Sequence, residues 1–76
     1  MALITTGHPT YVHEQPDPSQ YWVVAHLLNS EALICEVMLD IDGVLEVAIP
    51  ANVVYMTPDI IIIEWHKPHT GIARIA

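Results

Sequence analysis

Residues 33–49 read LICEVMLDIDGVLEVAI, and this stretch decides the fold. Over residues 33–41 apolar side chains recur at every second position, which is the period of a β-strand with one buried face. Asp42-Gly43 follows at once, and the alternation resumes over residues 44–49. A two-residue Asp-Gly connection between alternating runs is a strong local signal for a β-hairpin, because both turn residues must accept a positive φ. We predict an antiparallel hairpin that turns at Asp42-Gly43; a helix over residues 31–39 is the competing interpretation.

Further strands are predicted from β-branched and aromatic residues between turn signals. They cover residues 21–28, 51–55, 60–65 and 70–75, with a loop at residues 68–71 before the last one. Four consecutive isoleucines at 60–63 place apolar side chains on both faces of their strand, so this strand is expected between layers or against a neighbouring subunit. Residues 1–20 contain three of the six prolines and little periodicity. The prediction is therefore one all-β domain over residues 21–76, a small antiparallel β-sandwich or barrel-like meander, with an extended N-terminal arm at 1–20 that orders against another chain.

The composition favours assembly. Of the 76 residues 53% are hydrophobic and 14% are charged, whereas about a quarter of the residues in ordinary domains are charged. A chain this short buries a modest share of its surface, and small domains usually add disulfides, a metal or partner subunits. Cys35 is the only cysteine, which excludes an intramolecular disulfide. Apolar surface left over in such a chain is expected to contact other subunits.

The charge argues against several partners. Nine Asp and Glu against two Lys and Arg give a net charge of −7, which repels nucleic-acid phosphate and anionic membrane surfaces. The amino terminus lacks the basic start and apolar run of a secretory signal, so no export is expected. The run of isoleucines at 60–63 is far shorter than the roughly 18 residues of a membrane span, so no membrane insertion is expected either.

No group of residues predicts catalysis or a cofactor. His66 and His69 have a spacing that two ligands of one metal could share, but structural zinc normally takes four ligands. A Cys35–His26 pair would need an orienting group and an oxyanion site, and Cys35 fits better as a small core residue. The three glycines stand far apart, which excludes a phosphate-binding loop. The aromatic residues suit a sugar-binding platform less well than packing in a core or interface.

Two stretches carry a resemblance. Residues 11–26 read YVHEQPDPSQYWVVAH: an aromatic, a His-x-Gln, then a serine shortly before a Trp-x-x-x-His strand. Residues 63–73 read IEWHKPHTGIA and contain an aromatic-x-x-Pro-x-Thr-Gly-x-Ala pattern. In this order, with the Asp-Gly hairpin between them, they resemble a small β module of tail-fibre, baseplate and related virion proteins of tailed bacteriophages.

The resemblance implies a structural virion protein without catalytic residues, assembled in the host cytoplasm and located at the tail tip, baseplate or fibre attachment. It also implies a homo-oligomer, a trimer by analogy, that docks to other tail or head proteins. The interface residues expected are Tyr11, His13, Trp22, Ile60, Ile62 and Trp65. A small acidic phage-encoded inhibitor or decoy that occupies a basic site on a host protein is the alternative. A capsid decoration or carbohydrate-binding module is a further one.

Overall fold

The hairpin predicted at Asp42-Gly43 is present in the computed structural model, which describes residues 10–30 and 33–76. Strands β2 (Cys35–Ile41) and β3 (Val44–Val47) pair antiparallel, with Ile41 opposite Val44. Asp42 has φ 53° and Gly43 has φ 85°, the left-handed conformation that a two-residue hairpin turn requires. The helix considered for this stretch is therefore wrong over its described part.

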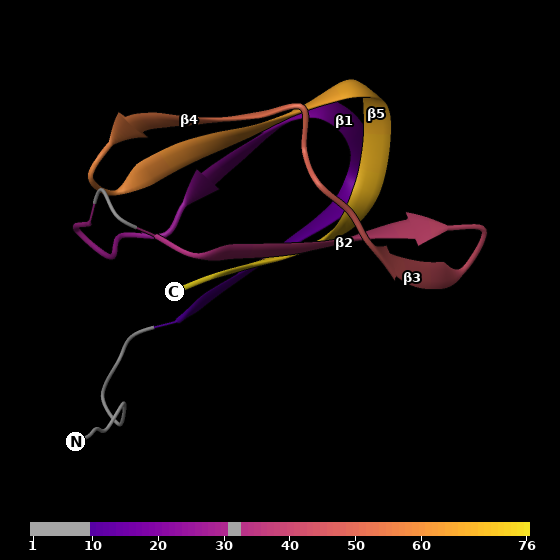
Figure 1. Cartoon of the computed structure of the whole chain (residues 1–76), viewed down its shortest axis with the longest axis horizontal. Coiled ribbons are helices and arrows are strands. Elements are labelled where there is room, and N and C mark those ends of the chain that lie inside the picture. Colours follow the sequence, from indigo (N-terminus) through magenta and orange to yellow (C-terminus); the bar gives the residue numbers. More distant parts are fainter. Residues whose placement is uncertain (1–9, 31–32) are drawn as a thin grey trace.

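The fold is all-β, as predicted, and is one antiparallel sheet of five strands. The other strands are β1 (Tyr11–Ala25), β4 (Asn52–Thr57) and β5 (Ile60–Ile75). Strand β5 is central: β1 pairs with it on one side, while β4 and β2 share the other side. In Figure 1 β1 and β5 bend together, so that the sheet folds back on itself into two layers.

The bend separates the two layers. The upper layer consists of β4 with residues 60–64 of β5 and residues 21–25 of β1. The lower layer consists of β3 and β2 with residues 71–75 of β5 and residues 11–15 of β1. The facing sides of both layers form a single hydrophobic core, whose buried members are Trp22, Val24, Val37, Leu39, Ile61, Ile63, Trp65, Ala73 and Ile75. Alternation along each strand places the remaining side chains on two outer faces.

The predicted division at residue 20 is wrong for the residues that the structure describes. Residues 11–20 belong to β1, and Tyr11 to Gln15 pair with β5 of the same chain. The alternation was hidden because the register shifts between Gln15, Ser19 and Tyr21. Before the shift the odd residues of β1 face inward and after it the even ones do, which is the effect of an irregularity in a period of two. Residues 1–9 of the predicted arm lie outside the described residues.

Strand β5 is also longer than predicted. The expected loop at residues 68–71 is part of one strand that runs without a break from Ile60 to Ile75. Pro68 is tolerated there because residues 65–68 have no strand partners at the bend. Gly71 is needed just after the bend, because a Cβ on it would meet the main-chain oxygen of Met38 and, at 3.0 Å, the Cα of Leu39 in β2. No helix of the described residues is long and apolar enough to cross a membrane.

Candidate functional site

Four rings form a ladder across the inside of the bend. His13 lies against Trp22 with centroids 6.0 Å apart, Trp22 against Trp65 at 5.2 Å, and Trp65 against His69 at 5.5 Å. The first two residues come from β1 and the last two from β5. Tilted and edge-on ring pairs at these distances stabilise a core beyond the area they bury. The ladder therefore joins the two motif-bearing stretches.

Hydrogen bonds hold the same bend. The Trp22 indole Nε1 donates to the main-chain oxygens of Ser19 at 3.1 Å and His69 at 3.2 Å. His13 Nε2 and Gln15 Oε1 lie 2.8 Å apart and share a hydrogen bond. The Ser19 hydroxyl accepts from the Tyr21 amide at 3.2 Å and donates to the Tyr21 oxygen at 2.8 Å. In this chain the side chains of the first motif thus hold the folded sheet together.

The structure does not gather the histidines into a metal site. His66 is exposed and His69 is half-buried with its ring edge on Trp65, and both lie in β5 rather than in the predicted loop. Among residues 10–30 and 33–76 no group of three His, Cys, Asp or Glu side chains is placed to hold a metal ion. His66 and His69 therefore have no third ligand in the part of the chain that the structure describes.

Cys35 and His26 have the surroundings of structural residues. His26 is 3% exposed, and its Nδ1 accepts a hydrogen bond from the Leu28 amide at 3.0 Å. Burial raises the pKa of the Cys35 thiol above its ordinary value, and the half-buried side chain packs against the core. A nucleophilic cysteine needs a lowered pKa, so the environment of Cys35 is the opposite of an activated thiol.

The six side chains predicted for an interface divide into three groups. Trp22 and Trp65 are 0% and 5% exposed in the core of the single chain, so their place in the interface set was wrong. Tyr11 and His13 are half-buried on the inner side of the lower layer, opposite Ile75 and Ala73. Ile60 and Ile62 are half-buried on the outer side of the upper layer. Of the six, Ile60 and Ile62 are the two that lie on an outer side of the folded sheet.

The outer side of the upper layer is an apolar surface, which we call the outer face. The register places its members side by side on three strands: Tyr21, Val23, Ala25, Asn52, Val54, Thr57, Ile60, Ile62 and Glu64. Val23 is 60% exposed in its centre, beside Ile62, and Tyr21 is 54% exposed at one end. Glu64 is the only charged residue among them. The sequence pointed to this face only through the unbroken run of isoleucines.

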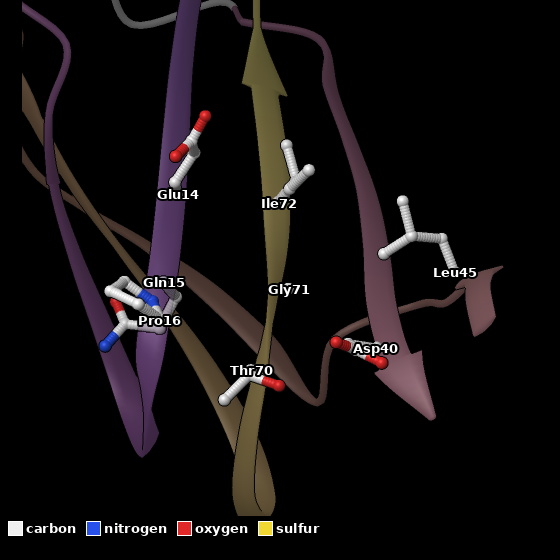
Figure 2. Close-up of a pocket in the computed structure, with 8 residues that line it drawn as sticks. All are labelled: Glu14, Gln15, Pro16, Asp40, Leu45, Thr70, Gly71 and Ile72. Carbon is white, nitrogen blue, oxygen red and sulfur yellow. The ribbon is translucent and has the colours of Figure 1, made fainter. Parts of the chain in front are cut away.

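The outer side of the lower layer differs from the outer face because the carboxylates of Glu14 and Asp40 lie on it. A shallow cavity of about 330 Å³ lies there over Gly71 and Ile72, between β1 and the β2–β3 hairpin. Figure 2 shows Glu14 on one side of this cavity and Asp40 on the other, with Leu45 beyond Asp40. Asp40 Oδ1 accepts a hydrogen bond from the Gly43 amide at 2.8 Å, so this carboxylate also holds the hairpin turn.

A second cavity, of about 420 Å³, lies on the inside of the bend. Leu39 and residues 48–51 line one part, and Trp65, His66, Lys67 and His69 line the rest. The Trp65 Nε1 is buried and has no hydrogen-bond partner among the described residues. No family model, curated protein or solved structure matches the chain, so the assignment of a site depends on this geometry alone.

Proposed function

We propose that the chain is a structural component of a bacteriophage virion that forms a homo-oligomer and docks to other virion proteins. The observation that carries the assembly part of this proposal is the outer face. Large exposed apolar patches are uncommon on monomeric proteins and usually mark interfaces. The outer face has one carboxylate, that of Glu64, and no basic side chain.

The outer face suits contact with another protein for a second reason. It is the back of a folded sheet, and the strands beneath it are held by the core on their other side. A rigid surface loses little conformational freedom when it is covered, so more of the apolar burial appears as binding free energy. Val23 and Tyr21, exposed by 60% and 54%, are the side chains with most to gain from a partner.

The virion context comes from the resemblance of residues 11–26 and 63–73 to the phage module. It gains support from the packing of those residues, because the two stretches pair with each other along β1 and β5. The bend of β1 and β5 needs residues of both motifs, which gives a structural reason for their occurrence in one chain. The trimer and the location at the tail tip, baseplate or fibre attachment are part of the proposal by analogy.

The alternative, an acidic decoy for a basic host surface, requires acids on one face. The described acids are spread instead: Glu14, Glu36 and Asp40 lie on the outer side of the lower layer, and Glu64 lies on the outer face. The others lie on β3, at the bend of β1 and in turns: Glu46, Asp17, Asp42 and Asp59. This dispersal favours assembly over the decoy.

The test is the solution mass of the full chain, measured by light scattering across a dilution series. The native protein is expected to be oligomeric, and Val23→Lys to shift it toward the monomer, because a buried ammonium without a partner is costly. Val12→Lys is the matched control, since Val12 is a 51% exposed valine of the same strand on the other layer. A native monomer at all concentrations, or equal effects of the two changes, would contradict the assembly proposal.

A further inference from the structure

The cavity on the inside of the bend has one wall made by the segment between β3 and β4. In Figure 1 this segment runs past the bend of β5, and its residues 48–51 line the cavity together with residues of that bend. The Ala48 amide donates to the Val37 oxygen at 3.0 Å, and the Ala51 amide donates to the Glu64 oxygen at 2.9 Å. The wall is therefore fixed at both ends. The volume of about 420 Å³ lies within the roughly 300–1,000 Å³ of small-molecule sites.

The charge around this cavity has the opposite sign to that of the whole chain. The net charge is −7, and Lys67 and Arg74 are the only lysine and arginine. Lys67 lines the cavity with His66 and His69, whereas no Asp or Glu among the described residues does. Alternation along β5 places Trp65, Lys67 and His69 on the same side of the strand, the inside of the bend. A concave site that gathers a cation and N–H donors without an acid attracts an anion.

A buried donor without an acceptor belongs to the same wall. Trp65 is 5% exposed and lines the cavity, and its Nε1 has no hydrogen-bond partner among the described residues. The Trp22 Nε1, in contrast, donates to two main-chain oxygens. Buried N–H groups are nearly always paired. The half-buried His69 ring lies edge-on against Trp65 at 5.5 Å, and it also lines the cavity. An acceptor for Trp65 is therefore most easily supplied from the cavity.

We propose that this cavity binds a small organic carboxylate with a short apolar body. The carboxylate lies beside Lys67 and His69, and a small rotation of the His69 ring lets one oxygen accept from the Trp65 Nε1. The apolar body contacts Leu39 and the wall at residues 48–51. One lysine matches a single negative charge, and the apolar wall matches a hydrocarbon part. The inference goes beyond the proposed assembly and does not depend on it, because the cavity and the outer face lie on different sides of the sheet.

The experiment is a titration of the full ¹⁵N-labelled chain with hexanoate, followed by the indole N–H resonances in NMR spectra. The chain has two tryptophans, so the resonance that Trp65→Phe removes identifies both. We expect the Trp65 indole proton to move downfield and saturate in the millimolar range, because it gains an acceptor. The Trp22 indole proton already has acceptors and is expected to stay in place. No saturable shift, or a shift of the Trp22 resonance alone, would overturn the inference.

Two further probes test the charge and the apolar part of the ligand separately. Hexylamine has the same hydrocarbon chain with a positive charge, and it is expected to leave the Trp65 resonance unchanged. Acetate keeps the carboxylate and lacks the chain, and it is expected to bind more weakly than hexanoate because it buries less apolar area. An equal response to hexylamine and hexanoate would contradict recognition of an anion, and equal affinity for acetate and hexanoate would contradict the role of the apolar wall.

A pair of charge-matched variants tests whether the cation of the cavity is responsible. Lys67→Gln is expected to weaken hexanoate binding by up to about fivefold, the upper end for an exposed ion pair. Arg74→Gln removes the same charge on the outer side of the lower layer, opposite Glu36, and is expected to leave the affinity unchanged. Both side chains are exposed, so both variants are expected to keep the thermal midpoint. Equal weakening by the two changes would show an effect of net charge alone and would contradict the site.

Discussion

The indole Nε1 of Trp22 donates a hydrogen bond to the main-chain oxygen of His69, 3.2 Å away and 47 residues along the chain. This bond joins the two strands at the point where both turn from one layer to the other. The same N–H also reaches the oxygen of Ser19 at 3.1 Å, so a single donor ties together both sides of the register shift in β1.

Trp22→Phe is expected to lower the free energy of unfolding, measured by urea titration, because the two oxygens lose a shared buried donor. The loss of such a bond costs about 1–3 kcal/mol. Trp65→Phe is the matched control, since it removes a similar buried ring whose Nε1 has no acceptor among the described residues. It is expected to cost less than Trp22→Phe, and a larger cost for Trp65→Phe would refute the role of the Trp22 donor.

Gly71→Ala is expected to destabilise the fold by about 1–3 kcal/mol, the usual cost of forcing an atom into a packed site. The added methyl group would meet the main chain of Met38 and Leu39, which cannot rotate away. Gly43→Asn tests the turn glycine: Gly43 has open space around it, so the cost there is the backbone strain of φ 85° alone, which is smallest for residues such as asparagine, and a smaller loss of stability is expected. Thermal unfolding should separate the two variants, and a Gly71→Ala midpoint equal to that of the native chain would show that the strands can move apart.

Cys35 is expected to react slowly with iodoacetamide at neutral pH in the folded chain and faster in urea. Burial raises its pKa above the ordinary 9.0, and the thiolate is the reactive form. Because the unfolded thiol loses its proton at a lower pH than the folded thiol, the neutral Cys35 stabilises the folded chain fully below pH 9. This contribution to the free energy of unfolding is lost as the pH rises through the pKa of the folded thiol. Cys35→Ala should flatten that part of the pH profile; an identical decline in both chains would assign it to other groups.

Local chemistry made the hairpin predictable, because Asp42-Gly43 and the alternating runs beside it contain all the information that the turn needs. The boundary of β1 was not predictable in the same way. In the sequence, Pro16 and Pro18 indicate the end of a strand. They are tolerated within β1 because β1 lies at an edge of the sheet, and the position of a strand in the sheet depends on the whole fold. The register shift beside them also changes which residues face inward, so a single period of two does not fit the strand.

The candidate site was predicted in part. The excess of apolar residues predicts a surface covered by a partner, which stays a prediction; the structure places two of the residues expected there, Ile60 and Ile62, on the outer face. Trp22 and Trp65 were misplaced because aromatic residues suit a core and an interface equally well, and the choice depends on the fold at the bend. The exposure of Val23 could not be inferred either, since burial depends on which strands lie above and below it.

The central place of β5 has a consequence for how the chain folds during synthesis. Of the strand pairs in the described chain, β1, β2 and β4 each need β5, and only the β2–β3 hairpin can form before residue 60 has been made. The first strand must therefore remain without its partner until nearly the whole described chain has left the ribosome. Pairing between distant segments is slow. The prolines of β1 would hinder hydrogen bonding between the still unpaired β1 and the strands of other nascent chains.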